Sequence, residues 1–245
     1  MGTACAVALM AALMAALLGL RQWLRKRLVA GPGIPASRAA EPEDARFWSR
    51  WAGRYDRFME RDAPLYDRMA ALMKERLGRD MHVLELACGT GAISQRIAGS
   101  VRDLEATDYA PEMICEAKKK PHSARLHYSV QDATDLPYGP ETFDVVVIAN
   151  ALHIVPEPEK VLHEARRVLK KDGLLIAPTF VHGERVGFRP RIRMLELAGF
   201  QAYHKWDVQG FEEFVSRCGF SAAGKRMMGS KIAPLCYLEA RPTDG

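Results

Sequence analysis

The spacing of apolar residues changes near residue 80. Between residues 45 and 77, aromatic and aliphatic side chains recur at steps of three and four, which predicts two amphipathic helices. Beyond that point, short apolar runs alternate with helix-like stretches, a pattern typical of βαβ units and a parallel sheet. The expected strands are residues 82–88, 104–108, 126–132, 143–150, 174–180, 222–230 and 232–240.

Helix-like stretches separate these runs. They comprise residues 93–100, 111–120, 157–173 and 206–220, and Gly173 is expected to cap the third of them. The pattern predicts an α/β fold, a single Rossmann-like, doubly wound domain over residues 45–245 with a mostly parallel, seven-stranded sheet. Residues 182–206 are too many for a simple connection, so we expect a lid or a substrate-shaping insert there.

The first 28 residues differ from the rest of the chain. Ala4–Leu20 contains no charge, and a basic cluster around Trp23 follows it. This order predicts a membrane anchor over residues 1–28, because a cleaved secretory signal carries its basic residues before the apolar stretch. The positive-inside rule then places the catalytic domain in the cytoplasm, behind a linker at residues 29–44. An interfacial helix and an organelle presequence are the alternatives.

Net charge does not point to a nucleic-acid partner. The chain has 35 Lys and Arg against 30 Asp and Glu, but five of the basic residues lie within the first 40 residues, where no acidic residue occurs. The remainder is neutral and lacks the broad positive field that phosphate-backbone binding uses. The five cysteines show neither a C-x-x-C pair nor a zinc-site spacing, so we expect reduced thiols and no metal site.

A glycine turn follows the first expected strand. Gly89 and Gly91 come at the carboxyl end of that strand, where open α/β sheets bind their ligands, and glycine lets a ligand lie against bare backbone. Asp108 ends the second strand, 17 residues beyond Gly91, where a carboxylate can accept both hydroxyls of a ribose. The competing interpretation, an NAD dehydrogenase, would need glycine where this chain has Ser94.

Taken together, these residues resemble the class I S-adenosylmethionine (SAM)-dependent methyltransferases, in particular the small-molecule branch that includes the quinone C-methyltransferases. The resemblance covers residues 45–180. ELACGTG (85–91) is similar to the first motif of this family, with Ala87 where the first glycine usually stands. The resemblance implies SAM as the cofactor, with Glu85 and the Gly89–Gly91 backbone on its methionine part and Asp108 on its ribose.

The same resemblance implies further contacts with the cofactor. Met113 would pack on the adenine, Asp132 and Ala133 would border its amino edge, Asn150 and Ala151 would line the floor, and Tyr55 would close over the cofactor. Each of these residue types also has an ordinary structural role. Asp132 could cap a helix, Asp108 could end a strand, and Met113 and Tyr55 could be core residues.

The acceptor side of the site is less defined. His153 follows the fourth strand and serves either as a general base or as a residue that shapes its loop. Further candidates for the substrate pocket are His182, Tyr203, His204 and Trp206. Packing within a lid would explain the aromatic residues equally well. The arginines of residues 185–193 either meet an anionic substrate or form a solvated face.

We therefore expect a SAM-dependent methyltransferase that acts on a small or membrane-associated molecule of quinone, lipid or thiol type. Two alternatives remain: a catalytically silent, membrane-bound protein that binds SAM, and an RNA or protein methyltransferase. The sequence fixes neither the acceptor nor the oligomeric state.

Overall fold

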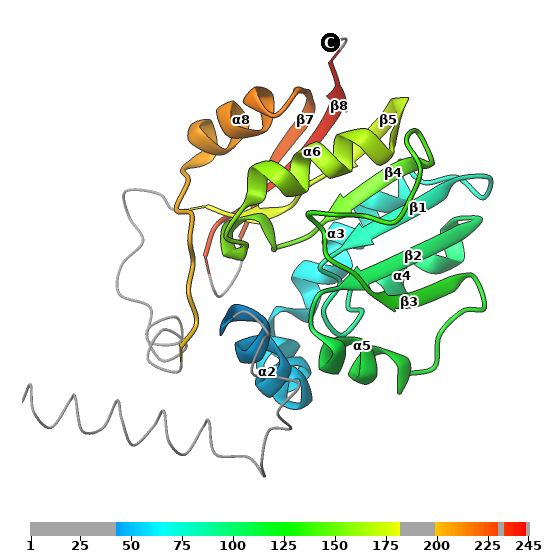
Figure 1. Cartoon of the computed structure of the whole chain (residues 1–245), viewed down its shortest axis with the longest axis vertical. Coiled ribbons are helices and arrows are strands. Elements are labelled where there is room, and N and C mark those ends of the chain that lie inside the picture. Colours follow the sequence, from blue (N-terminus) through cyan, green and yellow to red (C-terminus); the bar gives the residue numbers. More distant parts are fainter. Residues whose placement is uncertain (1–42, 182–198, 230–232, 244–245) are drawn as a thin grey trace, which may run out of the picture. The chain divides into compact units, whose positions relative to one another are not determined.

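The computed structural model describes residues 43–181, 199–229 and 233–243 (Figure 1). The chain forms two compact units, the larger of which contains residues 48–187 and 202–245. In the described part of the smaller unit, the rings of Phe47 and Phe200 lie 6.1 Å apart. The expected anchor, nearly all of the linker and most of the insert lie outside the described residues. Within the described ranges, no helix is long and apolar enough to cross a membrane.

Two helices precede the sheet, as the spacing of apolar residues predicts. Helix α2 spans Glu43–Met59, and α3 spans Ala63–Lys74 after the 3-10 turn η2 at Glu60–Asp62. Pro64 stands in the first turn of α3, where its missing N–H costs no hydrogen bond. The prediction of two helices is confirmed.

The sheet is mixed and has eight strands among the described residues, so the prediction of seven mostly parallel strands is only partly right. Five strands run parallel in the order β3-β2-β1-β4-β5, β8 pairs antiparallel with β5, and both β6 and β7 pair with β8. The strands are β1 His82–Leu86, β2 Asp103–Asp108, β3 Leu126–Val130, β4 Phe143–Ile148, β5 Leu169–Ile176, β6 Thr179–Phe180, β7 Phe220–Met228 and β8 Leu235–Pro242.

The eighth strand arises because one predicted strand is interrupted, and not because a further segment joins the sheet. The stretch 174–180, predicted as one strand, is divided between β5 and β6, which pair with β8 in a single register. Pro178 lies at the break and has no N–H to donate to the ladder. Its carbonyl accepts instead from the backbone N–H of Asn150 at 2.7 Å. The proline thus breaks the strand without changing its register.

The expected helix cap at Gly173 is wrong. Helix α6 spans Pro158–Val168, and β5 begins at the next residue, Leu169. The pairing of β5 with β4 then shifts in register, which leaves a bulge before Leu174. A Cβ on Gly173 would lie 2.7 Å from the Leu169 side chain, so this glycine permits a close approach inside the bulge.

Helices cover both faces of the sheet (Figure 1). Helices α3, α4 (Ser94–Ile97) and α5 (Pro111–Lys118) share one buried cluster with the strands, while α6 and α8 (Val208–Arg217) share the other. Side chains alternate along a strand, so Val83 of β1 enters the first cluster and Leu84 the second. The parallel strands all end at one edge of the sheet, and the candidate site lies there.

Candidate functional site

The turn after β1 contains three residues with positive φ: Ala87 at 53°, Gly89 at 56° and Gly91 at 81°. Glycine adopts this conformation without strain, whereas an alanine bears a cost of about 1–2 kcal/mol. A Cβ on Gly91 would also lie 2.1 Å from the hydroxyl oxygen of Tyr128. Alanine is thus tolerated but strained at the expected first glycine position, and Gly91 is required by both its φ and its surroundings.

Asp108 fixes this turn from the end of β2. Its Oδ2 accepts a hydrogen bond from the backbone N–H of Gly89 at 2.8 Å, and its Oδ1 accepts one from Ala110 at 2.9 Å. Burial raises the pKa of Asp108 to about 6, against the lowering effect of these two hydrogen bonds. The carboxylate is therefore mostly ionised at neutral pH, and each oxygen keeps a lone pair for another donor.

Glu85 is a deeply buried carboxyl group at this edge, with 2% of its surface exposed. Its Oε2 accepts a hydrogen bond from the hydroxyl of Ser94, the residue that replaces the third glycine of a dinucleotide fingerprint. Burial raises the pKa of Glu85 to about 8, although the Ser94 hydrogen bond lowers it; the charge of Asp108 adds to the rise. Glu85 is mostly protonated at neutral pH, and a nearby cation would favour its ionised form.

Tyr55 of α2 lies over the glycine turn. Its Cε1 is 3.8 Å from the position that a Cβ on Gly89 would take. Met113 belongs to a small buried cluster against which Tyr55 packs. Burial, followed by the neighbouring Tyr66, raises the pKa of Tyr55 well above its ordinary value, so the phenol stays neutral. The structure thus brings Tyr55 and Met113 together beside the turn.

Asp132 and Ala133 follow β3. Oδ1 of the exposed Asp132 accepts hydrogen bonds from the backbone N–H of Thr134 at 2.8 Å and from its hydroxyl at 2.7 Å. Asp132 therefore stabilises a local turn. The backbone N–H of Gln131 donates to the carbonyl of Asp108 at 3.2 Å, which holds this segment beside the end of β2.

The loop after β4 begins next to the glycine turn. Leu86 and Ile148 are register partners at the ends of β1 and β4. Each is followed within two residues by a non-glycine residue of positive φ, Ala87 on one side and Asn150, at 57°, on the other. Ala151 is buried directly after Asn150. Backbone strain is therefore concentrated at this edge, as it often is at functional sites.

His153 lies in the 3-10 turn η4, Leu152–Ile154, and only 6% of its surface is exposed. Its ring packs edge to face on Phe180 with centroids 5.8 Å apart. The carbonyl of His153 accepts a hydrogen bond from the backbone N–H of His204 at 3.2 Å. The loop after β4 thus meets the described end of the expected insert.

The side chains of that end are anchored to α8. The rings of His204 and Trp206 stack with centroids 4.9 Å apart, and Trp206 stacks on Phe214 of α8 at 4.6 Å. Tyr203 is 37% exposed. His182, the remaining candidate for the substrate pocket, lies outside the described residues.

Solved structures share this fold. A chain from the complex between the Haloferax volcanii Trm112 methyltransferase activator and the putative methyltransferase has a TM-score of 0.69 at 18% identity, over 83% of this chain and 99% of that one. The DhpI–SAH complex has a TM-score of 0.61 at 23% identity, over 82% of this chain and 96% of that one. At such identities the likeness shows the fold alone.

Similar sequences indicate the type of reaction. Residues 84–177 match the methyltransferase domain family. A demethylmenaquinone methyltransferase of Clavibacter sepedonicus is 36% identical over 99 residues, 40% of each chain. The ubiquinone/menaquinone biosynthesis C-methyltransferase UbiE of Rickettsia akari is 37% identical over 109 residues, 40% of this chain and 44% of the relative. The chain thus spans about two fifths of the length of these curated relatives. Residues 84–177 therefore form a methyltransferase domain, and the match and its relatives support the class I, SAM-dependent type for that domain.

SAM is the cofactor of this methyltransferase domain, and the residues at the sheet edge fit it. Gly89 and Gly91 carry no Cβ, so at these two positions no side chain of the turn itself would separate a ligand from the backbone. Asp108 can still accept hydrogen bonds from ribose hydroxyls, because its two bonds to backbone N–H groups leave one lone pair on each oxygen. Glu85 is a buried acid that a cationic ligand would ionise. The contact made by each residue with SAM is a proposal.

Sequence reasoning missed the residues that connect α2 to the glycine turn after β1. Asp56, Thr90 and Lys120 meet there, although they come from three different segments. The sequence held only weak indications of a role for these residues: Asp56 follows Tyr55, and Thr90 stands between the two glycines. Nothing in the spacing of the sequence pairs Asp56 with Lys120.

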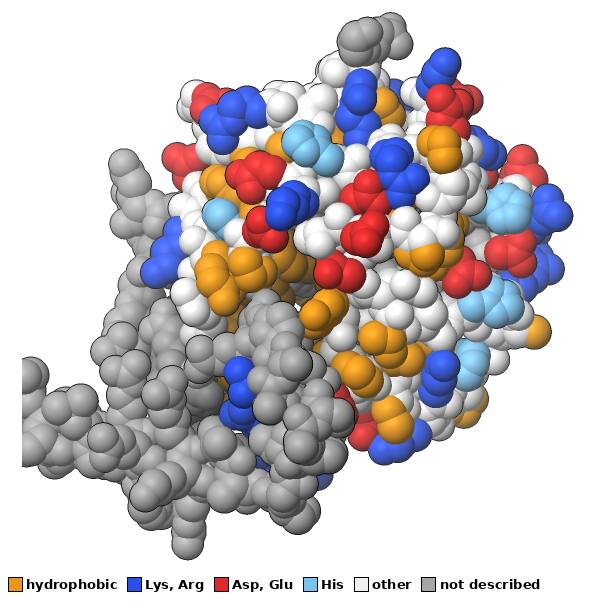
Figure 2. All heavy atoms as spheres, viewed as in Figure 1, with side chains coloured by type: hydrophobic (Ala, Val, Ile, Leu, Met, Phe, Trp, Pro, Cys, Tyr) orange, Lys and Arg blue, Asp and Glu red, His pale blue; other side chains and the backbone are white. Residues whose placement is uncertain are grey.

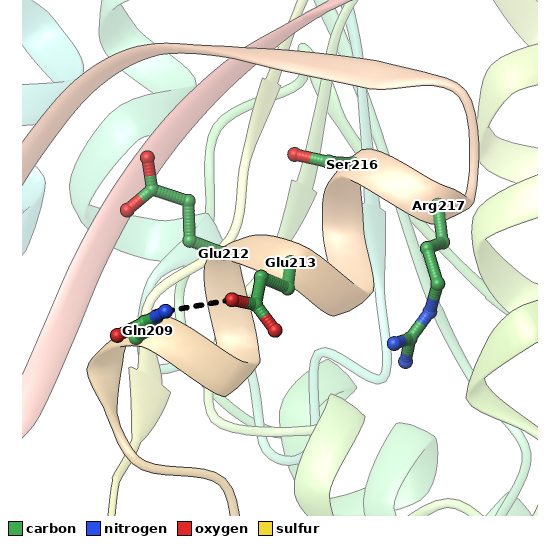
Figure 3. Close-up of a pocket in the computed structure, with 5 residues that line it drawn as sticks. All are labelled: Gln209, Glu212, Glu213, Ser216 and Arg217. Carbon is green, nitrogen blue, oxygen red and sulfur yellow. Dashed lines mark hydrogen bonds between the residues drawn. The ribbon is translucent and has the colours of Figure 1, made fainter.

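Other surfaces of the described structure show no comparable chemistry. A surface hollow of about 530 Å³ lies along α8 (Figure 3). On the face in Figure 2, described basic and acidic side chains are interspersed. No group of three or more His, Cys, Asp or Glu side chains in the described ranges is arranged to hold a metal ion. The described residues that line the hollow all come from α8: Gln209, Glu212, Glu213, Ser216 and Arg217.

Proposed function

We propose that this methyltransferase transfers the methyl group of SAM to a small molecule of the quinone type. The two sequence relatives described above are named as methyltransferases of quinone biosynthesis, which supports this substrate class. Because the match spans about two fifths of each relative, the activity and the acceptor of the whole protein are proposals.

The observation that carries the proposal is the pairing of Leu86 with Ile148. Adjacent strands lie about 4.8 Å apart, so the glycine turn after β1 and the loop with His153 after β4 start side by side. A cofactor on the turn would therefore have its neighbouring ligand beside the loop after β4. The stacked rings of His204 and Trp206 belong to the segment that meets this loop, and aromatic rings of this kind would suit contact with a planar acceptor.

The chemistry requires alignment more than a covalent intermediate. SAM supplies a methyl group on a positively charged sulfur, and the sulfur keeps the bonding electrons when the methyl leaves. The acceptor gains the methyl group and gives up a proton. In this proposal His153 contacts the acceptor and helps to exclude water from it, and its burial beside Phe180 supports that role.

We further propose that residues 1–28 hold the protein at a membrane, with the methyltransferase domain in the cytoplasm. The apolar run of Ala4–Leu20 and the basic residues after it support this proposal. Quinones with apolar side chains partition into membranes, so an anchor would bring the enzyme to such acceptors.

Transfer of a labelled methyl group tests the proposed function. The full chain, purified in detergent, is mixed with methyl-labelled SAM and a demethylated quinol. Asp108→Ala, which should bind SAM more weakly, is the control at a SAM concentration below saturation. We expect label in the quinone fraction. Label that enters only protein or RNA of a cell extract would overturn the quinone assignment. SAM binding without transfer to any fraction would overturn the enzymatic role in favour of a silent SAM-binding protein.

A further inference from the structure

The carboxylate of Asp56 joins three segments of the methyltransferase domain. The hydroxyl of Thr90, in the glycine turn, donates to its Oδ1 at 2.5 Å. The ammonium group of Lys120, just beyond α5, lies 2.5 Å from its Oδ2. Lys120 also donates to the backbone carbonyl of Thr90 at 2.9 Å. Asp56, Thr90 and Lys120 thus form a closed triangle of contacts, here called the latch.

The latch lies beside the part of α2 that covers the cofactor turn. Asp56 follows Tyr55, whose ring is 3.8 Å from the Cβ position of Gly89. Of two consecutive residues of α2, Tyr55 therefore lies over Gly89, and Asp56 is hydrogen-bonded to the next residue of the turn, Thr90. Because Tyr55 and Asp56 share one helix, a movement that separates Asp56 from Thr90 also lifts Tyr55 from Gly89.

The strengths of the latch contacts are unequal. The side chain of Asp56 is 54% exposed and that of Lys120 is 28% exposed, so solvent and salt screen this ion pair. Thr90 is fully buried, and its hydrogen bond to Asp56 is charge-assisted. The latch thus combines one buried, charge-assisted hydrogen bond with one solvent-screened ion pair.

We propose that Asp56 is a positioning residue that latches α2 over the bound cofactor through Thr90 and Lys120. While the latch is closed, Tyr55 covers the cofactor at the glycine turn. Release of the demethylated product, S-adenosylhomocysteine, requires the latch to open. This proposal rests on cofactor binding at the glycine turn, but not on the identity of the methyl acceptor.

The rate of product release from the full-length protein tests the latch. Bound S-adenosylhomocysteine is displaced with excess SAM in a stopped-flow instrument, and tryptophan fluorescence, which includes Trp48 and Trp51 of α2, reports the exchange. We expect Asp56→Asn to release the product about tenfold faster, because it loses its charge and with it the charge-assisted contacts. Lys120→Met should release it about threefold faster, since the hydrogen bond of Thr90 remains.

Lys119→Met is the matched control. Lys119, directly after α5, forms an ion pair with Glu116 of α5 at 2.7 Å, and Asp56 takes no part in this pair. We expect this variant to release the product at the wild-type rate. Raising the salt concentration should speed release in wild type and in Lys119→Met, but not in Asp56→Asn, because only the first two retain the ion pair of the latch. A purely structural role for Asp56 would not alter this salt dependence.

Thr90→Val keeps the proposal testable if Asp56→Asn fails to fold. It removes one hydroxyl from a buried site at nearly constant volume, and we expect faster release with the salt dependence retained. Wild-type release rates in folded Asp56→Asn, or in both Thr90→Val and Lys120→Met, would overturn the latch and leave the proposed function intact. A wild-type protein that binds neither SAM nor its product would overturn both.

Discussion

The carboxylate of Asp108 accepts a hydrogen bond from the backbone N–H of Gly89 at 2.8 Å, although 19 positions separate the two residues. The bond links the ends of neighbouring parallel strands, since Leu86 of β1 pairs with Thr107 of β2. The sheet therefore fixes the distance between the glycine turn and the carboxylate. A ligand that binds to both meets a preorganised site.

Replacing Asp108 by alanine should weaken SAM binding by about 1.5–3 kcal/mol, the range for losing hydrogen bonds to a charged group. Calorimetric titration of the folded variant measures this change. Asp103→Ala, at the opposite end of β2, is the control, and we expect it to change SAM affinity by less than about 0.5 kcal/mol. Unchanged affinity in Asp108→Ala would leave Asp108 with only a structural role at the strand end.

The two buried carboxyl groups should make stability fall as the pH rises from about 5 to 8. The folded pKa of Glu85 is about 8 and that of Asp108 about 6, both above the ordinary values of 4.5 and 3.8. The folded state therefore keeps protons that the unfolded chain has released, and the free energy of unfolding decreases until the folded pKa is passed. Glu85→Gln should remove most of the decrease between pH 6 and 8 and leave the smaller part that Asp108 contributes near pH 6. Urea unfolding of the wild type and of Glu85→Gln between pH 6 and 8 measures the free energy of unfolding. The same slope against pH in both proteins would contradict the prediction.

Replacing Ala87 by glycine should stabilise the fold by about 0.5–1 kcal/mol. The cost of a positive φ for alanine, about 1–2 kcal/mol, exceeds the extra flexibility that glycine gives the unfolded chain, about 0.5–1 kcal/mol. Ala71→Gly, on the exposed face of α3, should instead destabilise the protein by about 1 kcal/mol. Chemical denaturation measures the free energy of unfolding of both variants. An equal loss of stability in Ala87→Gly and Ala71→Gly would show that Ala87 bears no strain.

Substitutions on the acceptor side should separate methyl transfer from cofactor binding. His153→Ala and His204→Ala should slow transfer while leaving SAM affinity nearly unchanged. His153 lies in the loop after β4, the backbone of His204 is hydrogen-bonded to it, and neither residue is part of the glycine turn. If His153 is a general base, its loss should cost roughly 10²–10⁴-fold in rate and change the pH profile; if it shapes the loop, the loss should be smaller and independent of pH. Wild-type turnover in both variants would place the acceptor elsewhere.

Residues 1–28 should be necessary for membrane attachment, because an apolar run with a basic flank inserts with that flank in the cytoplasm. Fractionation of cells that express the full chain or a chain starting near residue 29 measures the effect. We expect the first in the membrane fraction and the second in the soluble fraction. Full-length protein that is soluble at physiological salt would contradict an anchor.

Local patterns predicted the elements whose causes are local. The helices before the sheet follow from apolar spacing, and the turn at Gly89–Gly91 follows from glycines directly after an apolar strand. Gly173 shows the limit of such patterns. A glycine after a basic helical stretch looks like a cap, but here it lies in a strand, because pairing with β4 and burial of Leu169 outweigh the helix propensity of the preceding lysines.

The sequence by itself determined the α/β class, the glycine turn and Asp108, because strand periodicity and glycine chemistry act over a few residues. Only the tertiary structure decided which distant groups meet. Asp56 contacts Lys120, and His153 holds His204 through a backbone hydrogen bond, because the sheet and its covering helices bring these segments together. Such contacts depend on packing between remote elements, and single polar side chains leave no periodic signal along the chain.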